Sequence, residues 1–120
     1  MRHLKKTKKL KRTNEERRKL FVDLSRALIK NGKITTFTAR AKWFAPQFER
    51  LITLIKKAGD DQVLAMRRMR KYFSEADSKK IVTEIAPKFK DRNGGYTRIL
   101  KLDQDFSTHD KSIVALTLDN

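Results

Sequence analysis

The side chains of this chain that could carry chemistry are mostly cations. Of its 120 residues, 30 are Lys or Arg and 14 are Asp or Glu, which gives a formal net charge of +16 at pH 7. A Lys or Arg that meets a backbone phosphate releases a condensed counterion, and the resulting affinity does not depend on sequence and falls with salt. The charge therefore predicts a polyanionic partner, most simply a nucleic acid.

The densest cluster of cations is the N-terminal segment 1–12, which contains no carboxylate. With only Leu4 and Leu10 as sizeable aliphatic side chains, it cannot offset its chain entropy and charge repulsion by burial. We expect an extended basic arm that becomes ordered on a polyanion. Its candidate RNA-binding cations are Arg2, Lys5, Lys6, Lys8, Lys9, Lys11 and Arg12.

Further cations recur along the rest of the chain. Each of these groups, taken alone, is also compatible with an ordinary solvated face. The candidates are Arg17 and Arg18 in the first predicted helix, Arg67, Arg68, Arg70 and Lys71 in the third, and Lys88, Lys90, Arg92, Arg98 and Lys101 beyond it.

The most specific local motif is Arg92-Asn93-Gly94-Gly95-Tyr96-Thr97-Arg98. Two glycines let the backbone approach a phosphate or sugar, the flanking arginines can fork onto phosphates, and Tyr96 offers a ring for an unstacked base. The alternative is a strand-entry turn with Tyr96 in the core. Both interpretations remain open on chemistry alone.

Catalysis has little support in the sequence. His3 and His109 are the only histidines, and the pair His109-Asp110 is more typical of a solvated turn than of a base and its orienting group. Asp60 and Asp61 suit a helix cap better than a magnesium site. Cysteine is absent, which excludes disulfides and thiolate chemistry. We expect no catalytic residue, metal, cofactor or small-molecule substrate, and a small nuclease is the enzyme alternative.

No segment approaches the roughly 20 apolar residues that span a bilayer, and the first residues lack the apolar core of a secretory signal. We therefore expect a cytoplasmic protein with no membrane partner. A basic N-terminus can also imitate an organelle transit peptide, but Thr7 is the only hydroxyl residue of the arm, which makes an organellar location the less favoured alternative.

The pattern of apolar residues predicts an α+β domain over residues 13–120, with about four helices packed on one side of a small three-stranded sheet. Thr13 and Glu16 form a capping box for the first helix, and Gly32 ends it. A short strand over 33–37 follows, rich in β-branched residues.

A second helix is expected over about 39–57, capped by Thr38 and bent near Ala45 because Pro46 removes a backbone donor. Asp60-Asp61 should cap a third helix whose apolar positions run to Phe73. We expect a fourth helix over 77–86 that Pro87 stops, and an antiparallel pair of strands over 96–102 and 111–118. Trp43, Phe44, Phe48 and Phe89 are expected in the core.

Several sequence blocks carry a resemblance to a known family. They are Met1-Arg2-His3 with Lys5, Leu10 and Arg12, then Ile34-Thr35-Thr36, Ala39-Arg40-Ala41-Lys42, Leu51-Ile52-Thr53-Leu54, Ile85-Ala86-Pro87-Lys88-Phe89, and the ungapped run from Asp91 to Lys101. On these blocks the chain resembles, from end to end, the bacterial large-subunit ribosomal protein family numbered seventeen. It departs from the family pattern at Leu4, Thr7, Phe37-Thr38 and Trp43-Phe44.

The resemblance implies a structural protein that binds large-subunit ribosomal RNA, near the outer end of the nascent-chain tunnel, beside neighbouring ribosomal proteins and in one copy per ribosome. It adds His3, Arg40 and Lys42 to the candidate RNA-binding residues. The main alternative is a DNA-binding or nucleoid protein, which shares the basic field but should carry a recognition helix or a dimer seam, and neither is evident.

Overall fold

A computed structural model describes residues 9–102 and 110–117 of the chain. Four α-helices and three strands make up the described part of the chain, in agreement with the predicted α+β class. The elements in chain order are α1 (Asn14–Asn31), β1 (Lys33–Phe37), α2 (Thr38–Lys57), α3 (Gln62–Met69), α4 (Glu75–Lys80), a π-helical turn η2 (Ile81–Ile85), a 3-10 turn η3 (Ala86–Phe89), β2 (Thr97–Lys101) and β3 (Lys111–Leu116).

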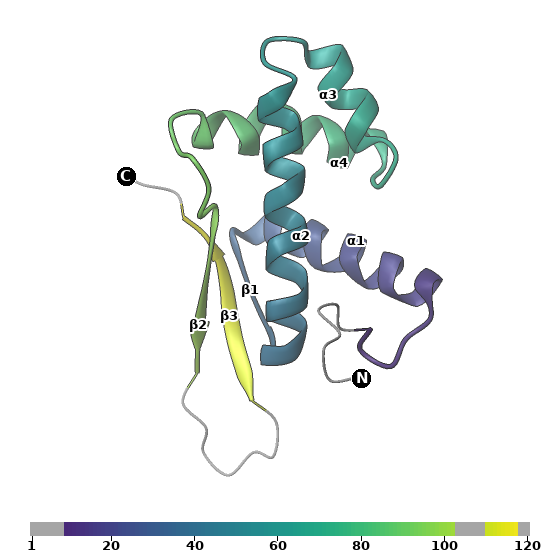
Figure 1. Ribbon diagram of the computed structural model, residues 1–120, viewed down its shortest axis with the longest axis vertical. Helices are drawn as coiled ribbons and strands as arrows, with labels where there is room; N and C mark the ends of the chain where they lie inside the picture. Colours follow the sequence, from purple (N-terminus) through teal and green to yellow (C-terminus); the bar gives the residue numbers. More distant parts are fainter. Residues whose placement is uncertain (1–8, 103–109, 118–120) are drawn as a thin grey trace, which may run out of the picture.

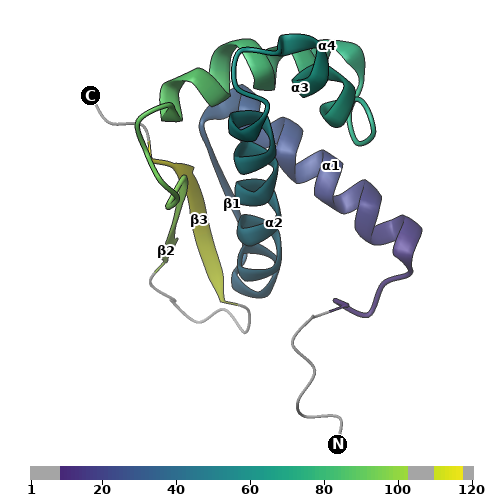
Figure 2. The ribbon, with the colours of Figure 1, turned by 45° about the horizontal axis from the view of Figure 1, so that its top comes forward.

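The three strands form one antiparallel sheet in the order β1-β3-β2. Ile34, Val114 and Ile99 lie in one row across it, and the alternation of side chains along each strand gives the sheet an inner and an outer face. Helices cover only the inner face, where Val114 is fully buried (Figures 1 and 2). On the outer face Leu100 is 51% exposed. The predicted one-sided packing is confirmed.

The two ends of α1 follow the predicted local chemistry. The Thr13 hydroxyl accepts a hydrogen bond from the Glu16 amide at 3.2 Å, and the Glu16 carboxylate accepts one from the Thr13 amide at 3.0 Å. These bonds lower the pKa of Glu16 below its ordinary value, the bond to the Thr13 backbone most of all. At the other end Gly32 takes the left-handed conformation, with φ of 79°. The predicted capping box and stop signal are confirmed.

Helix α2 differs from the prediction at Thr38, and Pro46 does not interrupt it. It runs without interruption from Thr38 to Lys57 through Pro46. Pro46 has no amide to donate to the Lys42 carbonyl, but Lys42 is exposed, so water can satisfy that carbonyl instead. The bend expected near Ala45 stays a prediction. Thr38 is its first residue and not its cap: the Thr38 hydroxyl instead lies 2.8 Å from that of Ser112 on β3.

The region after α2 also departs from its predicted boundaries. Helix α3 ends at Met69, several residues before Phe73, and α4 begins at Glu75, where the Ser74 hydroxyl caps it. Pro87 does not stop the fourth helix. The chain passes through η2 into η3, where a proline in the first turn needs no amide partner.

The core is built around α2, which has the sheet on one side and α1 on the other (Figure 2). Phe44 and Phe48 are fully buried, and the Phe44 ring lies 5.6 Å from that of Phe21 on α1. Trp43 and Phe89 are buried as well, so the four aromatic residues expected in the core are there. In the described parts of the chain, no helix is both long and apolar enough to cross a membrane.

Candidate nucleic-acid interface

A basic groove with a volume of about 650 Å³ lies between α1 and α2. Its cationic residues come from both helices, and none of the described residues that line it is an Asp or a Glu. We call it the basic groove. It is lined by Arg17, Arg18 and Phe21 from α1, by Lys42, Trp43, Pro46, Gln47, Arg50, Leu51 and Leu54 from α2, and by Tyr72 from the turn after α3.

The sequence of α2 explains why the cations meet here. Lys42, Pro46 and Arg50 are spaced four residues apart, so they share one face of the helix, and all three are exposed. The adjoining face carries buried Trp43 and Leu51, which form the apolar floor. The groove therefore combines a packed, rigid base with long cationic side chains at its rims.

This arrangement suits a nucleic-acid backbone. Arginine presents a planar fork of donors that matches the oxygens of a phosphate, and cations on both walls can contact one strand between them. The Tyr72 ring is 43% exposed at the edge of the groove, where an unstacked base could lie against it. The basic groove can thus neutralise phosphates and hold a base at the same time.

Two residues of the basic groove, Arg50 and Tyr72, are missing from the sequence prediction. The four-residue spacing from Lys42 to Arg50, within the helix predicted over 39–57, is a signal that could have identified Arg50. No local signal identifies Tyr72, because it comes from a turn that only tertiary packing brings beside α1 and α2.

The described end of the N-terminal arm, residues 9–12, is a tight turn held to α1. Arg12 donates its backbone amide to the Lys9 carbonyl at 3.1 Å. The Arg17 guanidinium donates to the Arg12 carbonyl, to the Lys9 carbonyl at 3.4 Å and to the Asn14 side chain. Arg17 therefore fixes the root of the arm beside the basic groove. The side chains of Lys9 and Lys11 are exposed, whereas Arg2, His3, Lys5, Lys6 and Lys8 lie outside the described residues.

Three other predicted cations make contacts within the protein. The Arg68 guanidinium donates to the Leu54 carbonyl at 2.7 Å, which ties α3 to α2. Lys101 forms an ion pair with Asp110 at 3.5 Å, and Arg40 lies over the Phe37 ring at 5.1 Å from its centroid. Arg68 in particular serves the fold through this bond.

The remaining cations of the third helix lie on a different surface from the basic groove. Arg67 and Arg70 line a shallow hollow of about 540 Å³ with Gln62, Val63 and Met66. Lys71 follows in the exposed turn after α3. The structure therefore does not gather all predicted cations into one site.

Residues 92–95, which we call the glycine loop, are held by several hydrogen bonds. Gly94 and Gly95 have φ of 101° and 61°, which L side chains rarely adopt. Arg92 donates its Nε to the Gly95 carbonyl at 3.2 Å, and the Thr117 hydroxyl donates to the same carbonyl at 2.6 Å. Asn93 and Arg98 are exposed, the latter on the outer face of the sheet. The loop thus holds a fixed shape at one end of the sheet.

Tyr96 and Thr97 anchor that loop to α2. The Glu49 carboxylate accepts the Tyr96 amide at 3.3 Å and the Thr97 hydroxyl at 2.6 Å. The Tyr96 ring is 3% exposed and packs on Phe89 with 5.2 Å between centroids, so it presents no face to a base. The structure favours the core alternative for this side chain.

Lys56 completes the anchor. Its ammonium donates to the Tyr96 hydroxyl at 3.1 Å and to the Arg92 carbonyl. Burial raises the pKa of Tyr96, but the hydrogen bonds with Lys56, the Gly94 backbone and Thr53, together with the positive charge of Lys56, outweigh burial, so the net shift is downward. Lys56 therefore links the last turn of α2 to both ends of the glycine loop.

The described residues contain no group of three His, Asp or Glu side chains that could hold a metal ion. Of the acidic residues considered above, Asp61 caps α3 by accepting the Leu64 amide at 3.1 Å, whereas Asp60 makes no such bond. The predicted cap therefore belongs to Asp61 alone. Both histidines, His3 and His109, lie outside the described part of the chain.

Comparison with known proteins gives consistent matches. A family model described as ribosomal protein L17 matches residues 20–117. The chain is 47% identical over 107 residues to the large ribosomal subunit protein bL17 of Persephonella marina, covering 87% of this chain and 83% of that protein. It is 44% identical over 104 residues to bL17 of a Sulfurihydrogenibium species, covering 86% and 84%, and 45% identical over 103 residues to bL17 of Sphingopyxis alaskensis, covering 84% and 71%.

Proposed function

Because this chain belongs to the ribosomal protein L17 family, it is a structural protein of the large ribosomal subunit, and we propose that it binds large-subunit rRNA mainly through the basic groove. The observation that carries this proposal is the charge of the groove: Arg17, Arg18, Lys42 and Arg50 surround an apolar floor, and no carboxylate is among its described lining residues. The mechanism is neutralisation of phosphates by a rigid surface, with specificity supplied by the tertiary shape of the RNA.

The arm extends the same interface. We infer that residues 1–12 act as a basic RNA-binding arm and residues 13–120 as one globular domain. The support is the contact of Arg17 with the carbonyls of Lys9 and Arg12, which starts the arm beside the basic groove. An RNA strand in the groove is then within reach of the cations of the arm, which become ordered on contact with phosphate.

Family membership also bears on the location of the protein in the cell. The ribosomes of the bacterial relatives are cytoplasmic, and this chain shares that location. We propose a position near the outer end of the nascent-chain tunnel, contacts with neighbouring ribosomal proteins, one copy per ribosome and no enzymatic activity. The comparisons lend no support to the nucleoid or nuclease alternatives.

Sedimentation tests the proposed function. In a cell lysate, the full-length protein should travel with the large subunit after a moderate salt wash. Purified protein should also bind a large-subunit rRNA fragment in preference to duplex DNA when both compete at one fixed salt concentration. Loss from the subunit, or preference for DNA, would overturn the ribosomal assignment.

Deletion of residues 1–12 tests the arm. Several phosphate contacts should vanish together, so rRNA affinity should fall and its dependence on salt should flatten. Filter binding at several salt concentrations measures both quantities. An unchanged salt slope would reject the role of the arm while leaving the basic groove as the binding site.

A further inference from the structure

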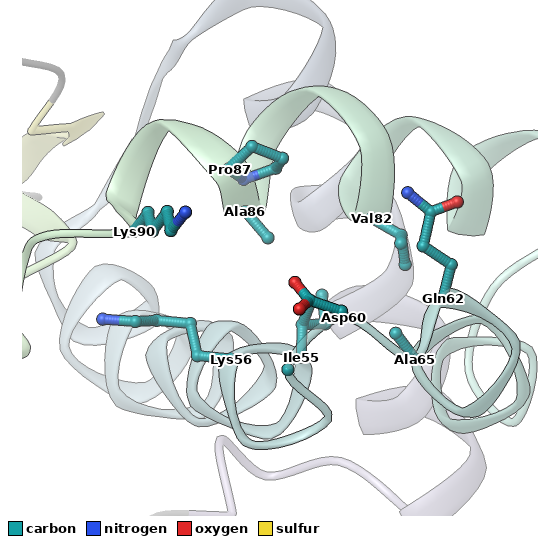
Figure 3. Close-up of a pocket in the computed structure, with 10 residues that line it drawn as sticks. Ile55, Lys56, Asp60, Gln62, Ala65, Val82, Ala86, Pro87 and Lys90 are labelled. Atoms are coloured by element: carbon teal, nitrogen blue, oxygen red, sulfur yellow. The ribbon is translucent and has the colours of Figure 1, made fainter.

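A third hollow, at the C-terminal end of α2, differs in its chemistry from the basic groove. It is a pocket of about 370 Å³ between the last turn of α2, the following turn and the η2–η3 segment (Figure 3). Ile55, Ala65, Val82 and Ala86 are buried residues of its walls, and Pro87 lies at its exposed side. The volume falls in the range of small-ligand sites, and the walls are apolar enough to hold an aromatic ring.

Asp60 brings a carboxylate into this pocket. The turn after α2, in which the Asp61 amide bonds the Ala58 carbonyl at 3.2 Å, places Asp60 so that its carboxylate points between the walls (Figure 3). Asp61 already caps α3, so the cap does not require Asp60. Across residues 9–102 and 110–117, the Asp60 carboxylate has no hydrogen-bonding or ionic partner.

Lys90 supplies the cation of the pocket. Its side chain reaches from the end of η3 toward Pro87 (Figure 3), and its ammonium has no partner among the described residues. Lys56, the other lysine of the pocket, points away from the pocket in that view because its ammonium is bound to the Arg92 carbonyl and the Tyr96 hydroxyl. The pocket therefore presents one carboxylate and one ammonium at separate places around apolar walls.

This charge pattern selects an occupant. A carboxylate repels phosphate, so Asp60 would weaken a site built only for an RNA backbone, and Lys90 would weaken one built for a cationic side chain. A nucleotide satisfies both groups, because its base carries hydrogen-bond donors and its phosphate is an anion. Among the four bases, guanine alone presents two adjacent donors, N1–H and N2–H, on its Watson–Crick edge, and these match the two oxygens of a carboxylate.

We propose that this pocket holds one unpaired guanine nucleotide of the ribosomal RNA. The ring lies between the apolar walls, its Watson–Crick edge donates to the Asp60 carboxylate, and its phosphate meets Lys90. Unpaired bases that leave a stack are the usual targets of sequence-specific RNA recognition. This inference rests on the proposed rRNA-binding function and adds a base-reading site to it.

Nucleotide titration of the full-length protein tests the pocket. The probes are guanosine and adenosine monophosphates, followed through the amide chemical shifts of Gly59 and Ala65. We expect GMP to bind about tenfold more tightly than AMP, and D60N to remove that preference. D61N is the matched control, since it removes the same charge one residue away and keeps a good helix cap, and it should retain the preference. K90A should weaken the binding of GMP but not that of guanosine, which lacks the phosphate.

The outcomes separate the pocket from the proposed function. Equal binding of GMP and AMP by the wild type, or an unchanged preference in D60N, would overturn the guanine site. So would a stronger response of the same amides to arginine than to GMP, which would indicate a cationic protein partner. Binding of the wild type to rRNA is measured in parallel, and D60N should keep the bulk affinity and salt slope. Failure of the wild type to bind rRNA would instead reject the proposed function.

Discussion

The basic groove and the pocket share helix α2, but only the pocket has a carboxylate among its described lining residues. The groove has cations on both walls and no carboxylate among its described lining residues, whereas the pocket places Asp60 opposite Lys90. Cations alone hold a phosphate backbone whatever its sequence, while a carboxylate beside a cation discriminates among bases. The comparison teaches that one helix can carry a phosphate-binding surface along its side and a base-specific pocket at its end.

Removal of a core ring should break both regions at once. Phe44 is fully buried between α1 and α2, so Phe44→Ala should lower the free energy of unfolding by about 3–5 kcal/mol. Denaturant unfolding measures this loss. Val63→Ala, at a side chain that is 69% exposed, is the control and should change stability far less. Equal losses in the two variants would mean that α2 is not the common support.

The groove should respond most strongly to loss of its cations. The double variant R18A/R50A removes one cation from each wall, and each lost phosphate contact should lower the salt slope of rRNA binding by about 1. The affinity at low salt should fall by roughly 2 kcal/mol. Filter binding over a salt series measures both.

The matched control for that variant is K30A/K79A, which removes the same charge from exposed lysines that do not line the groove. It should keep most of the slope. If the control and R18A/R50A lose equal slope, the groove has no special role and the charge acts only through the overall field. R18K/R50K keeps the positive charge but loses the planar guanidinium donors, so it separates the contribution of charge from that of bidentate hydrogen bonding.

Tyr72 sharpens the comparison because its ring would stack on a base in the groove without distinguishing one base from another. Tyr72→Ala should weaken rRNA binding by about 1 kcal/mol and leave the salt slope unchanged, since stacking releases no counterion. Tyr72→Phe keeps the ring and should bind like the wild type. A loss in the Phe variant as large as in the Ala variant would assign the effect to the hydroxyl and not to stacking.

The smallest expected effect concerns the start of α1, which supplies one wall of the groove. Thr13→Ala removes the capping hydroxyl and should lower the free energy of unfolding by about 1 kcal/mol. The partner Glu16 has a lowered pKa in the folded protein, so its contribution is present above the unfolded carboxyl pKa and is lost as pH falls through the folded value. Glu16→Gln should therefore remove part of the loss of stability below about pH 4.

Local signals in the sequence predict much of this fold. The capping box of Thr13 and Glu16 and the stop at Gly32 depend on a few adjacent residues, and both occur as predicted. The alternation in β3 predicts its pairing as well. Pro46 does not interrupt α2, because the cost of a missing amide depends on whether the facing carbonyl is exposed, which the chain order does not reveal.

The candidate site is less predictable than the fold. Composition identifies the partner class, but it does not tell an exposed cation from one that bonds inward. Arg68 and Tyr96 turn into the protein because Leu54 and Lys56 lie across from them, at separations of 14 and 40 residues. Tyr72 joins the basic groove for the same reason, because tertiary packing brings the turn after α3 beside α1 and α2.

Pro46 has one more consequence, for the sugar of the bound strand. Because Pro46 has no amide hydrogen, the Lys42 carbonyl lacks its usual helical donor, and both residues line the basic groove. A ribose 2′-hydroxyl can donate to such an oxygen, whereas deoxyribose has no group to offer. One imino acid in the wall would thus make the groove sensitive to the chemical difference between RNA and DNA.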